Sequence, residues 1–287
     1  MKHKSADIKR IVIFLLLSFS IAWIPWTIMN SRYGFHEWFT RENQYVFLWV
    51  TLISGGAPAI ATILTRIITK EGAADGLLRL KLKGNLKYYV LALLLPLAVG
   101  LLRSMITRNM DFAEKPALSG WMTASYLMQA IWLSALMAFN TFGEEYGWRG
   151  YLYPKLEAVW NRPAAIIAGG IIWGLWHAPL TVKGHNFGTD YPGFPWLGIL
   201  LMCGSCVIMG IFFHWLTLKT GSIYPASIAH STTNNGASLL LMIFVQVNSD
   251  NHDIPLSANI LLLAPALLYL LFIPFLMKNR TREQKYI

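Results

Sequence analysis

Repeated apolar runs of about 20 residues constrain this chain more than any other feature of its sequence. Runs of that length cross the hydrocarbon core of a bilayer as α-helices, and within a bilayer only helices and closed barrels satisfy every backbone polar group. Of the 287 residues, 55% are hydrophobic and only 13% are charged, whereas soluble domains carry about 25% charged residues. The sequence therefore predicts an all-α, polytopic membrane protein.

Eight apolar runs are long enough to be read as spans, and the basic residues are divided unevenly between their two ends. The predicted spans are residues 11–30, 45–69, 88–107, 122–142, 164–182, 195–218, 222–246 and 256–277. With the N-terminus in the cytoplasm, 18 of the 24 Lys and Arg residues fall on the cytoplasmic side, as the positive-inside rule requires. We expect about eight transmembrane helices in one domain, residues 1–287, with both termini cytoplasmic.

The formal charge of +10 does not indicate a nucleic-acid partner, because the basic residues lie in loops rather than in one patch. Residues 70–87 alternate apolar and basic side chains, a pattern typical of a segment lying on an anionic leaflet; a substrate-recognition surface is the alternative. Cys203 and Cys206 lie in an apolar run without further ligands nearby, so they are expected to be small packing residues. Membrane lipid is thus an expected partner, and the sequence leaves the oligomeric state open.

Ionisable residues inside spans are costly and mark functional sites by default. Glu144 and Glu145 lie at the predicted inner end of the fourth span, and Arg149 follows Glu145 by four residues. Residues at that spacing share a helix face, so Arg149 is predicted to hold Glu145 while Glu144 points elsewhere. A carboxylate in a dry cavity suits a general base. The alternative is a solvated ion pair at a cytoplasmic helix end.

Two later spans also carry polar residues. His177 lies in the sequence WGLWHAP of the fifth span, and His230 and Asn234 lie four residues apart on the seventh. Both residues of that pair donate hydrogen bonds, and two donors on one face suit an oxyanion site. The alternatives are a packed structural histidine and polar contacts between helices. His214, in the sixth span, has no partner in the pattern and is expected to be structural.

Together, these three patterns resemble the motifs of the family of intramembrane CAAX proteases and bacteriocin-processing enzymes, the CPBP or Abi family. The family pattern is Glu-Glu-x-x-x-Arg, then aromatic-x-x-x-His, then His-x-x-x-Asn, each on its own span. Its counterparts here are Glu144, Glu145, Arg149, Trp173, His177, His230 and Asn234. Tryptophan replaces the more usual phenylalanine at position 173. The resemblance covers residues 120–245, which we expect to form the catalytic core.

The resemblance implies an intramembrane endopeptidase that hydrolyses a peptide bond near the cytoplasmic leaflet. Glu144 and His177 would activate a water, and His230 and Asn234 would bind the oxyanion. Glu145 and Arg149 would support them. The substrate would be a peptide or a prenylated protein, through removal of the C-terminal tripeptide of a CAAX sequence or through processing of bacteriocin-like peptides.

Two further questions concern the metal and the class of protein. A metal-free mechanism is favoured, because asparagine is a good oxyanion donor and no His-Glu-x-x-His pair is present; zinc held by Glu144, His177 and His230 is the alternative. The rival to an enzyme is a proton-coupled transporter or a non-catalytic scaffold. Transporters are often built from paired halves, whereas here the polar spans all lie in the second half.

The span limits leave one conflict. They place Glu144 towards the cytoplasm and His177 near the opposite end of the next span. The two side chains can meet only if the fifth span begins later than residue 164, or if residues 150–163 form a helix that dips inward.

Overall fold

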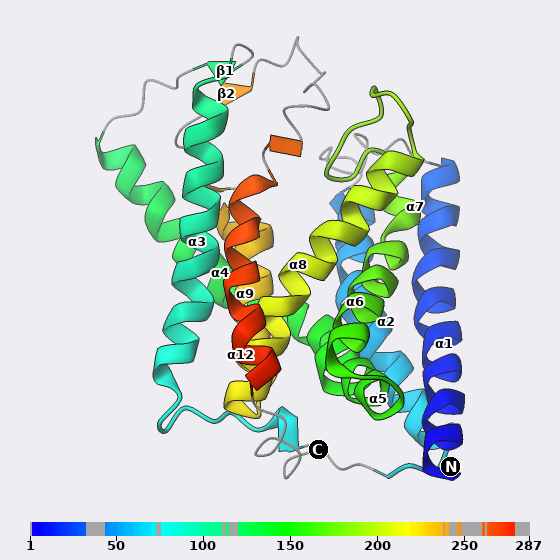
Figure 1. Cartoon of the computed structure of the whole chain (residues 1–287). Helices are drawn as coiled ribbons and strands as arrows, with labels where there is room; N and C mark the ends of the chain where they lie inside the picture. The colour runs from blue at the N-terminus through cyan, green and yellow to red at the C-terminus, as the bar shows by residue number, and fades with distance from the viewer. Residues whose placement is uncertain are drawn as a thin grey trace.

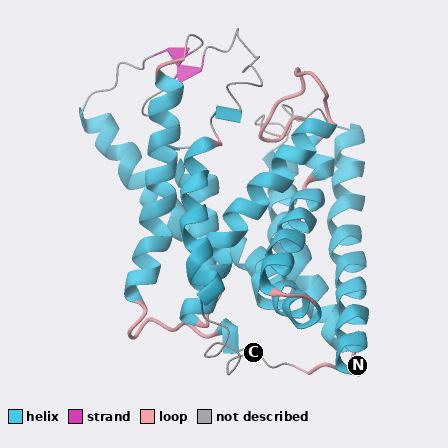
Figure 2. Ribbon diagram, in the orientation of Figure 1, coloured by secondary structure: helices cyan, strands magenta, loops and turns pink. Residues whose placement is uncertain are grey.

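The chain was examined as a computed structural model, which describes residues 2–32, 44–72, 76–110, 113–114, 120–237, 239–240, 246–247, 260–261 and 263–278. These ranges are helical apart from one short strand pair and the connecting loops (Figures 1 and 2). The first half contains α1 (Lys2–Arg32), α2 (Gln44–Ile68), η3 (Gly76–Leu78), α3 (Leu86–Arg108) and β1 (Ala113–Glu114). The second half contains α4 (Gly120–Gly147), η4 (Trp148–Leu152), α5 (Tyr153–Val159), α6 (Arg162–Trp176), α7 (Ala178–Thr181), α8 (Trp196–Thr220), α9 (Tyr224–Ser231), η5 (Thr232–Gly236), β2 (Gln246–Val247), η6 (Ala264–Phe272) and α12 (Ile273–Lys278).

Four helices in the described ranges are long and apolar enough to cross a membrane. They are Lys4–Arg32, Leu86–Arg108, Gly120–Val159 and Trp196–Thr220. The apolar helices Gly55–Ile68, Arg162–Trp176 and Ala264–Met277 are shorter. At 1.5 Å per residue, the 15 residues of α6 extend about 22 Å, less than the hydrocarbon thickness of about 30 Å. The all-helical class is therefore confirmed, and the number of about eight spans stays a prediction.

Small residues let the site-bearing helix α4 approach α2 closely. Gly143 and Gly147 lie four residues apart on α4, on the side that packs against α2. A Cβ added at Gly143 would collide with the carbonyl of Gly55, and one at Gly147 would collide with Pro58. Such a pair of small residues is a common interface between membrane helices, because it allows the two backbones to meet. It fixes the depth and rotation of Glu144 and Glu145, which lie between the two glycines.

A second pair of glycines joins α6 to α8. A Cβ at Gly170 would collide with Val207, and one at Gly174 would collide with Cys203. Cys203 and Cys206 are both buried and carry free thiols, which fits the predicted packing role. This contact holds the helix that carries Trp173 against the long helix α8, which crosses the molecule obliquely in Figure 1.

The chain beyond Glu145 resolves the conflict over the predicted span limits. The helix does not end near residue 142 but continues through η4 and α5 to Val159. After a short turn, α6 begins at Arg162, where Asn161 caps it by accepting a hydrogen bond from the backbone N–H of Ala164. The predicted inner end of the fourth span at Glu144 is thus wrong, because Glu144 lies well inside a longer helical run. Helix α6 then returns alongside that run and ends at Trp176, next to His177.

The strand pair is short and antiparallel. Ala113 of β1 is paired with Val247 of β2, and Glu114 with Gln246. Gln246, predicted as the end of the seventh span, is therefore extended rather than helical. Residues 241–245 and 248–259 of the predicted seventh and eighth spans and their connection lie outside the described residues.

Candidate functional site

The buried centre of the site is an ion pair extended by a histidine. Arg149 Nη1 donates to Glu145 Oε1 at 2.9 Å, and His230 Nδ1 lies 2.9 Å from the same oxygen. Glu145 and Arg149 are completely buried and His230 is nearly so. The predicted pairing of Arg149 with Glu145 is present in the structure. The link from Glu145 to His230, on a helix 85 residues further along the chain, was not predicted.

π-Helical turns accompany both motifs. The turn η4 (Trp148–Leu152) contains Arg149 and begins three residues after Glu145, and η5 (Thr232–Gly236) begins two residues after His230. Single π-turns inside α-helices are rare and occur frequently at functional sites, because the extra residue redirects the side chains that follow. No sequence signal used here distinguishes these turns from ordinary α-helix.

Trp173 joins the remaining parts of the site. Its indole Nε1 donates to Glu144 Oε2 at 3.2 Å, and its ring packs edge-on against His230 with centroids 5.1 Å apart. The Arg149 guanidinium lies over the same ring, 4.3 Å from its centroid, at cation–π distance. The sequence pattern included Trp173 only as the aromatic of its motif. Its polar N–H is what connects α6 to the carboxylate of Glu144.

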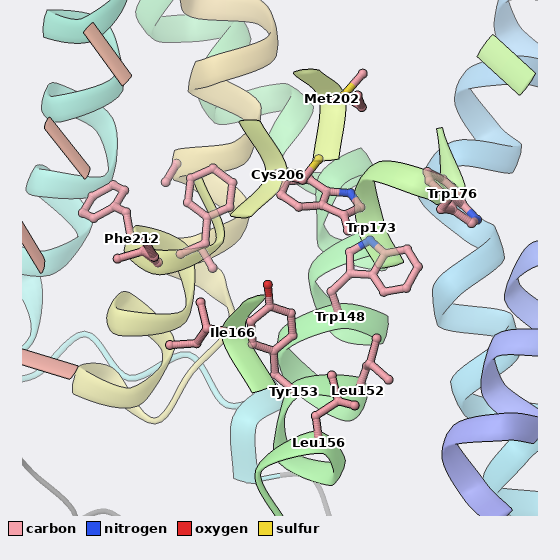
Figure 3. Packing of buried hydrophobic residues seen from close by; sticks show 14 of the residues in the cluster. Trp148, Leu152, Tyr153, Leu156, Ile166, Trp173, Trp176, Met202, Cys206 and Phe212 are labelled. Atoms are coloured by element: carbon pink, nitrogen blue, oxygen red, sulfur yellow. The ribbon is translucent and has the colours of Figure 1, made fainter. Parts of the chain in front are cut away.

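Further aromatic side chains pack near this centre, and Trp148, Tyr153 and Trp176 are among the buried residues labelled in Figure 3. Trp148 packs edge-on against Trp176 with centroids 5.6 Å apart, and the Arg149 guanidinium also lies 5.1 Å from the ring of Tyr153. Both tryptophans and Tyr153 are fully buried. These buried apolar rings lower the effective dielectric constant around the ion pair, so its electrostatic interaction is stronger than it would be at a surface.

His177 occupies the turn between α6 and α7. Its Nδ1 lies 2.9 Å from the carbonyl oxygen of Trp173. Because a carbonyl only accepts hydrogen bonds, Nδ1 carries the proton, and Nε2 of the neutral ring therefore has a free lone pair. The ring is half-buried and stacks on His185, a residue that the sequence patterns did not select, with centroids 6.1 Å apart. His177 thus presents a basic nitrogen one helical turn beyond the Trp173 that holds Glu144.

The same reasoning constrains His230. Its Nδ1 faces the Glu145 carboxylate, so Nδ1 carries a proton. For Nε2 also to donate, as an oxyanion site requires, the ring must take up a second proton and become an imidazolium.

Asn234 differs from the other residues of its motif in its surroundings. It lies within the π-turn η5, and its side chain is exposed, whereas His230 one turn earlier is 3% exposed. The pair therefore spans the boundary between the packed interior and the accessible surface of the protein.

His214 belongs to a different cluster. Its Nε2 lies 2.8 Å from Glu157 Oε1, and Arg162 Nε donates to the same oxygen at 2.9 Å. The sequence pattern offered His214 no partner on its own helix, and the structure supplies one from α5, a helix that was not predicted. The cluster joins α5, α6 and α8, which agrees with the expected structural role.

The three side chains named for a zinc ion do not form a ligand set. Within the described part of the chain, no three His, Cys, Asp or Glu side chains are grouped so that they could hold a metal ion. The side chain of His230 contacts the carboxylate of Glu145 rather than that of Glu144, and Glu144 accepts a hydrogen bond from Trp173. The geometry therefore gives no support to the zinc alternative, and metal-independence stays a prediction.

Comparison with known proteins gives two matches. Residues 126–236 match the model of the family described as type II CAAX prenyl endopeptidase, Rce1-like. The chain is also 29% identical over 237 residues to CAAX prenyl protease 2 of Methanococcus maripaludis, covering 79% of this chain and 84% of that protein.

The matched segment contains all three sequence motifs, and the apolar helices fit an integral membrane protein. The family recognised from the motifs is thereby confirmed. Residues 126–236 are similar to the Rce1-like family of type II CAAX prenyl endopeptidases, and the two comparisons together indicate that the chain is a protease.

Proposed function

We propose that this membrane protease hydrolyses a peptide bond with a water molecule activated by Glu144 and His177, while His230 and Asn234 hold the oxyanion. The observation that carries the proposal is the position of Trp173, which hydrogen-bonds Glu144, packs on His230 and accepts a hydrogen bond from His177. Three polar side chains from three separate helical segments are thereby gathered around one indole.

In the proposed reaction, Glu144 or Nε2 of His177 takes a proton from water as its oxygen attacks the carbonyl carbon of the substrate. The negative charge that develops on the carbonyl oxygen is met by the Nε2 proton of His230 and the side-chain amide of Asn234. When the tetrahedral intermediate collapses, the C–N bond breaks and the leaving amine receives the proton taken from water. Glu145 and Arg149 act by positioning His230.

We further propose a lipid-modified C-terminal peptide as substrate, cleaved near the cytoplasmic leaflet. The relative from M. maripaludis is named for action on CAAX prenyl proteins. An apolar cavity of about 360 Å³ lies between α3 and α4, and Thr123 is the one polar residue among the described residues that line it. A lipid chain is the chemistry that such a lining accepts. Bacteriocin-like peptides are the alternative substrate class.

The direct test is mass spectrometry of farnesylated and unmodified CAAX peptides incubated with the purified protein in lipid. We expect the wild type to release the C-terminal tripeptide, Glu144→Gln to release none, and Asp190→Asn, which removes an exposed loop carboxylate, to behave as wild type. Cleavage at the wild-type rate by Glu144→Gln would refute the assignment of Glu144.

A substitution that fills the cavity tests the lipid part of the proposal. Ala98 lines the cavity and is exposed, so Ala98→Trp is expected to fill the space with little loss of stability. The variant should raise KM for farnesylated peptide several-fold and leave KM for unmodified peptide unchanged. Ala124→Trp, at an exposed alanine of α4 outside the lining, is the matched control. An equal effect of both variants on both peptides would contradict the proposal.

A further inference from the structure

A second cavity lies where α8 ends and α3 begins. Its volume is about 420 Å³, and it is lined by Leu77, Lys81, Asn85, Arg149, Pro154, His214, Thr217, Leu218, Lys219, Thr220 and Gly221. Among the residues that the structure describes, the lining contains three basic side chains and no Asp or Glu, although one of the three, Arg149, is paired with Glu145. None of the residues assigned above to the peptidase reaction lines it, although Arg149, which supports them, does.

The segment before α3 is fixed over this cavity by backbone contacts. The backbone N–H of Ile223, just after the end of α8, donates to the carbonyl of Leu77 at 3.0 Å. A Cβ added at Gly221 would lie 2.8 Å from Lys81 Nζ, so the ammonium group of Lys81 stands beside the C-terminus of α8. Lys219 lies in the last turn of the same helix. Two half-buried lysines are thus held at one opening.

Buried polar groups of the lining still have hydrogen-bonding capacity. Arg149 is completely buried, yet its Nε and Nη2 have no hydrogen-bond partner among the described residues. Buried polar groups are normally satisfied, so this cavity, with two lysines and the unsatisfied guanidinium nitrogens of Arg149 in its lining, has the composition of an anion site.

We propose that this cavity binds a phosphate group, carried by an anionic lipid or by a soluble phosphoester. Lysines bind phosphate as point charges, and basic pockets between transmembrane helices bind phosphorylated head groups. The position at the ends of α3 and α8, two of the helices long enough to cross a membrane, is where a head group would lie. Leu77, Pro154 and Leu218 provide apolar walls for the carbon atoms attached to the phosphate.

The test measures binding rather than peptidase activity, so its result is independent of the proposed reaction. The full-length protein, purified in a phosphate-free maltoside detergent, is titrated with phosphatidic acid and with phosphatidylcholine and analysed by native mass spectrometry. A parallel arm titrates inorganic phosphate and glycerol 3-phosphate and measures the shift in Tm.

The decisive variant is Lys81→Gln with Lys219→Gln. It should weaken phosphate binding roughly 30-fold, because each lysine near such a group contributes about 1 kcal/mol and about 1.4 kcal/mol corresponds to a factor of ten. The control is Lys70→Gln with Lys83→Gln, which removes the same charge from exposed positions outside the lining and should bind as wild type. Leu77→Trp narrows the cavity without changing its charge and should also weaken binding.

The two arms identify the source of the phosphate. Lysine-dependent retention of phosphatidic acid with no response to soluble phosphate would assign a lipid head group, and a lysine-dependent Tm shift with glycerol 3-phosphate or inorganic phosphate would assign a soluble ligand. Equal affinity of the two double variants for phosphate would show that binding depends on general surface charge rather than on this cavity, and would overturn the proposal. Failure of the wild type to bind in either arm would overturn it as well.

Discussion

Replacing each of the two adjacent glutamates by glutamine is expected to lower the free energy of unfolding by very different amounts. Glu145 accepts hydrogen bonds from Arg149 and His230, and all three side chains are buried. In Glu145→Gln the Arg149 cation is left without its anion. Removing one partner of a buried ion pair costs about 3–5 kcal/mol, a large part of the 5–15 kcal/mol that stabilises a typical folded protein.

Within the described part of the chain Glu144 forms no ion pair with Lys or Arg, and its carboxylate accepts a hydrogen bond from Trp173. In Glu144→Gln the amide oxygen still accepts that bond. We therefore expect the free energy of unfolding to change by no more than about 1 kcal/mol, the net value of a single hydrogen bond. Peptidase activity, in contrast, should be abolished by both substitutions, because one removes the proposed base and the other releases His230.

The assay is reversible unfolding of the purified variants in mixed micelles, followed by circular dichroism, with peptide cleavage measured on the same samples. The double variant Glu145→Gln, Arg149→Met removes both charges and should recover most of the lost stability, because replacing a whole buried pair is often nearly neutral. Equal losses of stability in the two single variants, or a double variant as unstable as Glu145→Gln, would refute the reasoning.

Three further predictions concern the reaction and its pH dependence. Asn234→Ala should lower kcat by roughly 10²–10³-fold, the usual cost of one oxyanion donor; an unchanged kcat would remove Asn234 from the oxyanion site. Cleavage should continue at the same rate in the presence of a zinc chelator, and loss of activity that added zinc restores would contradict the metal-free mechanism. Burial lowers the pKa of His185 from 6.5 to about 4. Between these two pH values His185 is therefore protonated in the unfolded chain and neutral in the folded chain. Stability should therefore fall as the pH drops from about 6.5 to about 4, and unfolding measured across this range should show a smaller decrease for His185→Gln; identical slopes would contradict this.

The local parts of the site could be predicted from the sequence. Glu145 and Arg149 are four residues apart on one helix, and helical geometry alone brings such side chains together. The apolar runs identified the principal helices, because a membrane span needs a length and a composition that few other segments have. The order of the three motifs was sufficient to recognise the family.

The limits of the helices could not be predicted in the same way. Hydropathy marks where apolar residues end, but α4 continues as η4 and α5 through a segment that contains Arg149, Lys155 and Glu157. Lys155 and Glu157 are paired with groups on other helices; Lys155, for example, forms an ion pair with Asp7 at 3.2 Å. A run that looks like a cytoplasmic loop is therefore helical because of partners that are remote in the sequence.

The sequence by itself determined an all-helical chain, the family and the pairing of Glu145 with Arg149. Only the tertiary structure decided which glutamate holds His230, which indole reaches Glu144, and how η5 divides His230 from Asn234. The physical reason is the range of the interactions. Spacing along one helix fixes neighbours within about one turn. The meeting of α4, α6 and α9 depends in addition on the packing of α4 on α2 at Gly143 and Gly147 and of α6 on α8 at Gly174, and therefore on the whole fold.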